Sequence, residues 1–168
     1  MSDFNCTVCH NPHVSTIYEP DQGIRNTCVA CHPDQNLALH EGITFVRDGY
    51  SEQLACVSCH MPFAGLIASS ASPAVVGTLG GRMGDVHTHI FRIDTVNPTV
   101  AQMFNATGTQ VVKDSEGEAA VTVDFVCLRC HNGVGNAFII SANGAMTLAA
   151  TLHQNDAMGL AADFQPGM

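Results

Sequence analysis

Few stretches of this chain keep a hydrophobic period for long, so we expect little regular secondary structure. Residues 145–158 (AMTLAATLHQNDAM) are rich in Ala, Leu and Met and predict a helix. Residues 84–94 (GDVHTHIFRID) alternate and predict an extended segment. Residues 109–125 (TQVVKDSEGEAAVTVDF) alternate on both sides of a polar turn at Gly117 and predict a small β-hairpin. No large sheet is expected.

The most apolar stretch, residues 64–81 (AGLIASSASPAVVGTLGG), does not predict a membrane helix. It contains Pro73, several serines and four glycines, a composition that suits a loop. We therefore expect a chain that does not span a membrane. The N-terminus, MSDFNCTVCH, has neither the basic start nor the apolar region of a signal peptide, so none is visible in this numbering.

Length and charge set broad limits. With 168 residues the chain is long enough for one domain, which we expect to cover residues 1–168. Charged residues make up 12% of the chain, Lys113 is the only lysine, and the formal net charge is −9. A nucleic-acid-binding face is therefore not expected.

The cysteines carry the most specific signal, because all eight form C-x-x-C pairs and a histidine follows each pair directly. The motifs are Cys6/Cys9/His10, Cys28/Cys31/His32, Cys56/Cys59/His60 and Cys127/Cys130/His131. This is the attachment signature of c-type haem: two thiols one helical turn apart form thioethers with the haem vinyl groups, and the adjacent imidazole ligates the iron. Disulfides, redox-active thiol pairs and zinc knuckles also use C-x-x-C, but none of them requires the histidine. The pattern predicts four covalently bound haems, with a short helical turn at each motif.

Four haems on this chain leave 42 residues for each, too few for a conventional core around every one. The haems would then supply much of the buried apolar surface, and the protein would be largely an irregular wrapper around them. The first three motifs begin 22 and then 28 residues apart, whereas 71 residues separate the third from the fourth. The long segment 62–126 must therefore contain structure of its own, which we expect to be the loop and the hairpin.

Five histidines lie outside the motifs, and four irons need four sixth ligands. These histidines are His13, His40, His87, His89 and His153. They suffice to make every iron bis-histidine with one to spare. Irons with both axial positions filled cannot bind a substrate, which favours electron transfer over catalysis. The seven methionines are rival ligands, but core packing explains most of them.

His13 follows His10 by only three residues. The two axial ligands of one haem lie on opposite faces of a macrocycle roughly 10 Å across, and three residues span at most ~10 Å. His13 is therefore expected to ligate a different haem from His10; the alternative is an exposed loop histidine beside Pro12.

The other four histidines are harder to assign. We expect His40, in a short turn ended by Gly42, to be a distal ligand of one of the first two haems, and His153 to be that of the fourth. The alternative for each is a surface histidine. In an extended segment His87 and His89 point to the same face and cannot both bind one iron. Either they serve neighbouring haems, or one of them is a partner of a haem propionate together with Arg82 or Arg92. We expect His89 to be the ligand and His87 to be the spare; the reverse assignment is the alternative.

Short sequence segments in and around the motifs resemble those of a known protein family. The CHNPH start, CHMPFA at the third motif, GDVHTHIFRI, and VDFVCLRCHNG at the fourth motif resemble the multihaem cytochromes that form extracellular filaments, the tetrahaem cytochrome nanowires of bacteria and archaea. The resemblance implies a mostly irregular fold wrapped around a continuous haem stack, with every iron bis-histidine. It also implies that an N-terminal histidine, here His13, ligates a haem of the next identical subunit. Such a head-to-tail contact generates a helical polymer.

The leading interpretation is a secreted electron-transfer protein without catalytic activity, extracellular or at the cell surface, that passes electrons between redox partner proteins and extracellular acceptors. One alternative is a monomeric periplasmic tetrahaem shuttle, although such carriers are typically lysine-rich. Another is an enzyme that reduces nitrite or hydroxylamine, which needs a five-coordinate haem.

Overall fold

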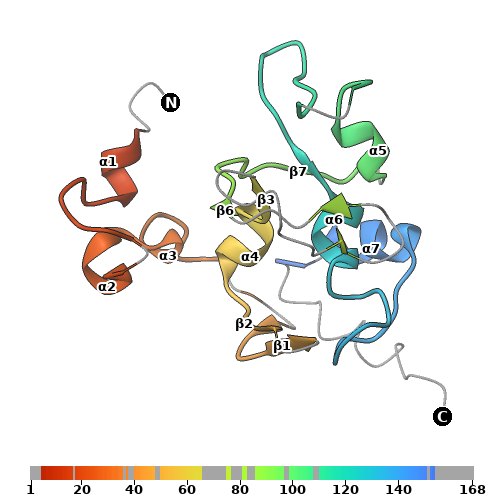
Figure 1. Cartoon of the computed structure of the whole chain (residues 1–168), viewed down its shortest axis with the longest axis horizontal. Helices are drawn as coiled ribbons and strands as arrows, with labels where there is room; N and C mark the ends of the chain where they lie inside the picture. Colours follow the sequence, from red (N-terminus) through yellow and green to blue (C-terminus); the bar gives the residue numbers. More distant parts are fainter. Residues whose placement is uncertain are drawn as a thin grey trace. The chain divides into compact units, whose positions relative to one another are not determined.

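The computed structural model describes residues 5–16, 18–35, 37, 40–47, 50–65, 75–76, 81–82, 86–96, 99–107, 110–150 and 152–153. The chain divides into two compact units, residues 1–36 and residues 37–168. The first holds two of the cysteine motifs and the second holds the other two. We describe each unit by itself (Figure 1), and the single domain expected over the whole chain stays a prediction.

The first unit consists of three single-turn helices, α1 (Cys6–Cys9), α2 (Pro20–Gly23) and α3 (Cys28–Cys31). The Asn5 side chain caps α1 by accepting the N–H of Thr7 at 3.0 Å. The segments after α1 and α2 are tied together by an antiparallel bridge between His10 and Ile24. Among the described residues of this unit, Gly23 alone is fully buried. The described part of the unit therefore has no hydrophobic core of its own.

The described sheets of the second unit are all small. The described strands form four pairs: β1 (Thr44–Arg47) with β2 (Tyr50–Gln53), β3 (Phe63–Gly65) with β6 (Val86–His87), β4 (Val75–Val76) with β5 (Gly81–Arg82), and β7 (Ile93–Asp94) with β8 (Val121–Thr122). The first three pairs are antiparallel and the last is parallel. The β4–β5 pair lies mostly within the stretch expected to be a loop; residues 66–74 and 77–80 of that stretch lie outside the described residues.

The core of the second unit lies around α6 (Val123–Leu128), which follows β8 directly. Figure 1 shows α6 beside α7 (Ala142–Ala149), and these two helices are in contact. The unit also contains α4 (Cys56–His60) and α5 (Val100–Met103). Two clusters of buried side chains surround α6: Met103, Val121, Phe125 and Val126 form one, and Val123, Leu128, Ile140 and Ala145 form the other.

Two sequence expectations can be compared with these elements. The helix expected over residues 145–158 exists as α7, but it begins at Ala142, capped by Ser141, and ends before His153. A hairpin was expected over residues 109–125, and the prediction is wrong for the two strands that flank the turn. The turn itself forms, with Gly117 at φ +83° and a single bridge between Lys113 and Ala119. Beyond the turn, however, β8 pairs in parallel with β7, and Val121 of β8 is buried in the core.

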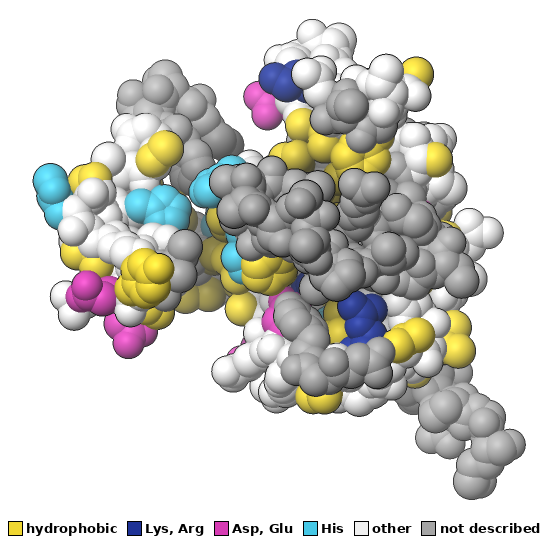
Figure 2. Space-filling model, in the orientation of Figure 1, with side chains coloured by type: hydrophobic (Ala, Val, Ile, Leu, Met, Phe, Trp, Pro, Cys, Tyr) yellow, Lys and Arg dark blue, Asp and Glu magenta, His cyan; other side chains and the backbone are white. Residues whose placement is uncertain are grey.

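The described surface keeps many hydrophobic side chains exposed in both units (Figure 2). Tyr18 in the first unit and Ile139 in the second are 86% and 70% exposed. None of the described helices has the length and apolar character needed to cross a bilayer.

Candidate haem-attachment sites

Each of the four motifs occupies one helical turn, as expected. The backbone N–H of the histidine donates to the carbonyl of the first cysteine at 2.9 Å in the first and second motifs and at 3.0 Å in the fourth. In the third motif the same turn lies within α4. Residues three apart on a helix lie on one side of it, so each turn presents two thiols side by side. This is the arrangement that two thioether bonds to one porphyrin edge require.

The sulfur atoms differ in burial between the units. All eight cysteines are free thiols; Cys6, Cys28 and Cys31 are exposed, whereas Cys130 is buried. Burial raises the pKa of the Cys127 thiol to about 12 and that of the Cys130 thiol to about 11. Reactive and metal-binding cysteines usually show a lowered pKa. The surroundings of the fourth motif therefore favour the uncharged form of both sulfurs.

Two motif histidines face a second imidazole. The ring centres of His60 and His153 are 5.9 Å apart with planes inclined by 22°, and those of His40 and His131 are 6.1 Å apart with planes inclined by 79°. Two imidazoles that bind one iron from opposite sides have ring centres about 6 Å apart, because each nitrogen lies about 2 Å from the metal and each ring centre about 1 Å farther out. Both histidine pairs have this spacing between ring centres.

Backbone carbonyls orient the motif histidines in the second unit. Nδ1 of His60 lies 2.7 Å from the carbonyl oxygen of Phe91, and Nδ1 of His131 lies 2.8 Å from that of Phe138. Because a carbonyl only accepts hydrogen bonds, Nδ1 must carry the proton in each case. The lone pair is then on Nε2, which is the nitrogen available to a metal.

His40 is held in the form that can ligate. It closes a short turn in which its N–H donates to the carbonyl of Leu37 at 2.8 Å, and Gly42 follows with φ +71°. Burial, and then the nearby His131 ring, keep the pKa of His40 below its usual value. The neutral imidazole is the form that binds metals.

The placement of His40 and His153 differs from the sequence expectation. His40 lies beside the fourth motif, because β1 is joined to the loop after that motif: Val46 N–H donates to the Asn136 side chain at 2.9 Å, and Asn136 N–H donates to the Val46 carbonyl at 3.1 Å. His153 lies beside His60 of the third motif, whereas the sequence led us to expect it at the fourth. The helix α7 packs on α6, which also contacts α4, and thus leads to the third motif. Neither pairing follows the order of residues along the chain.

His87 and His89 have different surroundings. Nδ1 of His87 is hydrogen-bonded to the carbonyl of Met61, and its ring lies 3.8 Å from that of Phe63. His87 is partly buried, whereas His89 is exposed. His87 thus has the same kind of Nδ1–carbonyl contact as His60 and His131. The local geometry therefore favours His87 as the ligand, the reverse of the sequence preference.

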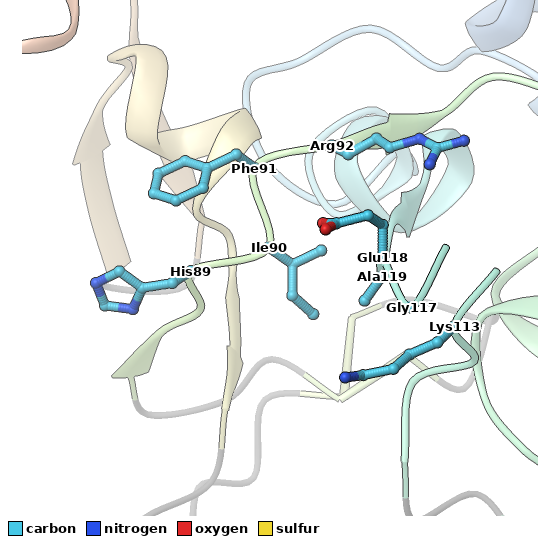
Figure 3. Close-up of a pocket in the computed structure, with 8 residues that line it drawn as sticks. All are labelled: His89, Ile90, Phe91, Arg92, Lys113, Gly117, Glu118 and Ala119. Atoms are coloured by element: carbon cyan, nitrogen blue, oxygen red, sulfur yellow. The ribbon is translucent and has the colours of Figure 1, made fainter. Parts of the chain in front are cut away.

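A cavity of about 310 Å³ lies beside His89, between residues 89–92 and the turn at residues 113–119 (Figure 3). The figure shows His89 and Phe91 on one side of the chain and Ile90 on the other, as expected for an extended segment. Arg92, one of the two expected propionate partners, forms an ion pair with Asp114 at 2.6 Å. The side chain of the other, Arg82, lies outside the described residues.

The remaining expected site residues belong to the first unit. His13 is exposed in a turn, where its backbone N–H donates to the Asn11 side chain at 3.2 Å. His10 is partly buried and His32 is exposed. Across the described residues of both units, no three His, Cys, Asp or Glu side chains converge on one point as ligands of a bare metal ion would.

Comparison of the chain with protein-family models, with curated proteins and with solved structures finds no match. The functional argument therefore rests on the residues and on their geometry.

Proposed function

We propose that this chain is a tetrahaem c-type cytochrome that transfers electrons. The observation that carries the proposal is the spacing of His60 from His153 and of His40 from His131, 5.9 and 6.1 Å, at two of the four C-x-x-C-H motifs. A c-type haem, when bound, supplies a one-electron iron couple. The eight motif cysteines would hold four such groups, and His10, His32, His60 and His131 would be the proximal ligands.

The chain would supply the distal ligands as well. His153 would complete the third site and His40 the fourth. His13, His87 and His89 are the remaining candidates, and the carbonyl contact of His87 favours it over His89 as a ligand. Imidazoles on both sides of every iron leave no position for a substrate, so the proposed activity is not enzymatic.

The haems would also stabilise the fold. In the described part of the first unit only Gly23 is buried, so the described residues form no apolar interior that could hold two motifs together. A haem between its turns would provide one. Small domains of this length usually need such a covalent or metal-based staple.

The first experiment is to count haems on the purified holoprotein. Mass spectrometry should give four haems per chain, and the reduced protein should show sharp Soret and α bands. The EPR spectrum of the oxidised protein should contain low-spin signals alone. Zinc bound at the thiols would refute the proposal, and a high-spin signal would favour the reductase alternative.

We further propose that the protein polymerises outside the cell, with His13 of one subunit ligating a haem of the next. The exposure of His13 and the exposed apolar side chains support this. Negative-stain imaging should show filaments for the wild type and for the His89→Ala control, and shortened or absent filaments for His13→Ala. A uniform wild-type monomer at high concentration would instead favour the periplasmic shuttle.

A further inference from the structure

One buried arginine joins the third motif to the fourth. Arg129 lies between Cys127 and Cys130, and its side chain is only 5% exposed. Its Nη2 donates to Oε1 of Glu52 at 2.8 Å and to the backbone carbonyl of Ser58 at 3.1 Å. Ser58 is the residue before Cys59 of the third motif. A side chain from inside one haem-attachment turn is thus bonded to the backbone of the other.

Both strands of the β1–β2 pair contact this arginine, one at its side chain and the other at its main chain. Glu52 lies on β2, and its side chain is 11% exposed. Arg47 lies on β1, and its Nη1 donates to the backbone carbonyl of Arg129 at 3.2 Å. The side chain and the main chain of Arg129 are therefore fixed by neighbouring strands, which limits any movement of the two motifs relative to each other.

The burial of this pair requires a reason. Removing two charges from water costs several kcal/mol per ion, so a buried ion pair often adds little to stability. The charges of Arg129 and Glu52 lie beside both motifs, because Arg129 sits between Cys127 and Cys130 and its Nη2 is bonded to Glu52 and to the carbonyl of Ser58, the residue before Cys59. The same charges would act on any redox group attached to these cysteines.

We propose that Arg129 and Glu52 are positioning residues that hold the third and fourth haems together and whose balanced charges set the reduction potentials of these two haems. The inference rests on the proposed function. Reduction adds one negative charge to a haem, so an uncompensated nearby cation favours the reduced form and an uncompensated carboxylate favours the oxidised form. Removing one member of the pair should therefore shift both potentials in a direction set by the charge that remains.

The main variant is Glu52→Gln, because glutamine keeps an oxygen that can accept the Arg129 hydrogen bond while it removes the charge. Spectroelectrochemical titration of the purified holoprotein should show two of the four couples moved to higher potential. We expect an approximately tenfold change in the ratio of reduced to oxidised haem at a given potential, or ~59 mV for a one-electron couple. Arg129→Met should move two couples to lower potential.

An exposed carboxylate provides the matched control for Glu52→Gln. Glu116 is exposed in the turn at residues 114–118, and Glu116→Gln should leave all four couples in place. If Arg129→Met does not fold, Arg129→Lys keeps the positive charge and should retain the wild-type potentials more closely than Glu52→Gln.

The haem count separates the two proposals. Fewer than four haems in the wild type would refute the proposed function. Four haems with unchanged potentials in Glu52→Gln, or shifts of the same sign in Glu52→Gln and Arg129→Met, would overturn this inference alone, because a merely structural role would not produce opposite shifts.

Discussion

At the scale of single residues, three imidazoles share one arrangement: Nδ1 of His60, His87 and His131 each lies against a backbone carbonyl. This contact fixes the ring and leaves Nε2 for the metal. We therefore expect His87→Ala to leave one iron five-coordinate, with a high-spin EPR signal in the oxidised holoprotein. His89→Ala is the matched control and should keep every iron low-spin. The opposite result would restore His89 as the ligand.

A second residue-scale prediction concerns Asp114, which organises the turn at residues 114–118. Hydrogen bonds from the backbone of Glu118 and from the Arg92 side chain hold the pKa of the Asp114 carboxyl below its usual value. The folded chain thus takes up this proton at lower pH than the unfolded chain does. The ionised carboxyl stabilises the fold above its unfolded pKa of about 3.9, and this contribution is lost as pH falls through the folded pKa.

Asp114→Asn should therefore lower the melting temperature slightly at neutral pH and should have a smaller effect at about pH 3 than at about pH 6. Thermal unfolding of the holoprotein over this range measures the difference. Glu116→Gln, in the same turn, is the control and should follow the wild-type pH profile. Parallel profiles for Asp114→Asn and the wild type would show that the carboxyl has no such role.

At the scale of elements, one glycine allows the loop after the fourth motif to approach β1. Gly135 has φ +115°, and a Cβ there would lie 2.7 Å from the carbonyl oxygen of Val46 and 3.0 Å from the Phe45 ring. Gly117 also has a positive φ, +83°, but a Cβ there would meet open space. Substitution of Gly117 therefore tests backbone strain alone, whereas substitution of Gly135 tests backbone strain together with close packing.

We expect Gly117→Ala to cost about 1 kcal/mol of unfolding free energy, from backbone strain alone. Gly135→Ala should cost more, about 2–4 kcal/mol, because β1 or the loop must also move. Chemical denaturation of the holoprotein measures both. Equal losses in the two variants would mean that the loop does not pack on β1 as described.

Some of these elements could be predicted from the sequence and others could not. The four helical turns could be predicted from the motifs, because the C-x-x-C-H spacing is the one expected of two thiols and an imidazole on a single helical turn. The helix α7 begins three residues before the predicted start at residue 145, at Ala142, where Ser141 is an ordinary N-cap signal. The pairing of β8 with β7, and of His40 with His131, depends on contacts between segments far apart in the chain. Local alternation does not encode such contacts.

At the scale of the whole molecule, buried side chains are unevenly distributed. The second unit has two buried clusters around α6, whereas the described part of the first unit buries only Gly23. If haem takes the place of a core, the two units should depend on it to different degrees. The first should lose its structure when its haem is lost, because its helices are single turns that are marginal in water.

The double variant Cys6→Ser/Cys9→Ser tests this dependence, because it prevents covalent attachment at the first motif. Hydrogen exchange should become faster for backbone amides of residues 5–35, such as those of Asn11 and Arg25, which donate across the His10–Ile24 bridge at 2.8 and 2.7 Å. Amides of β8 and α6 should keep their protection and serve as the internal control, because the clusters of the second unit do not use this haem. Unchanged exchange in the first unit, with mass spectrometry showing one haem fewer, would mean that these turns are held by the polypeptide itself.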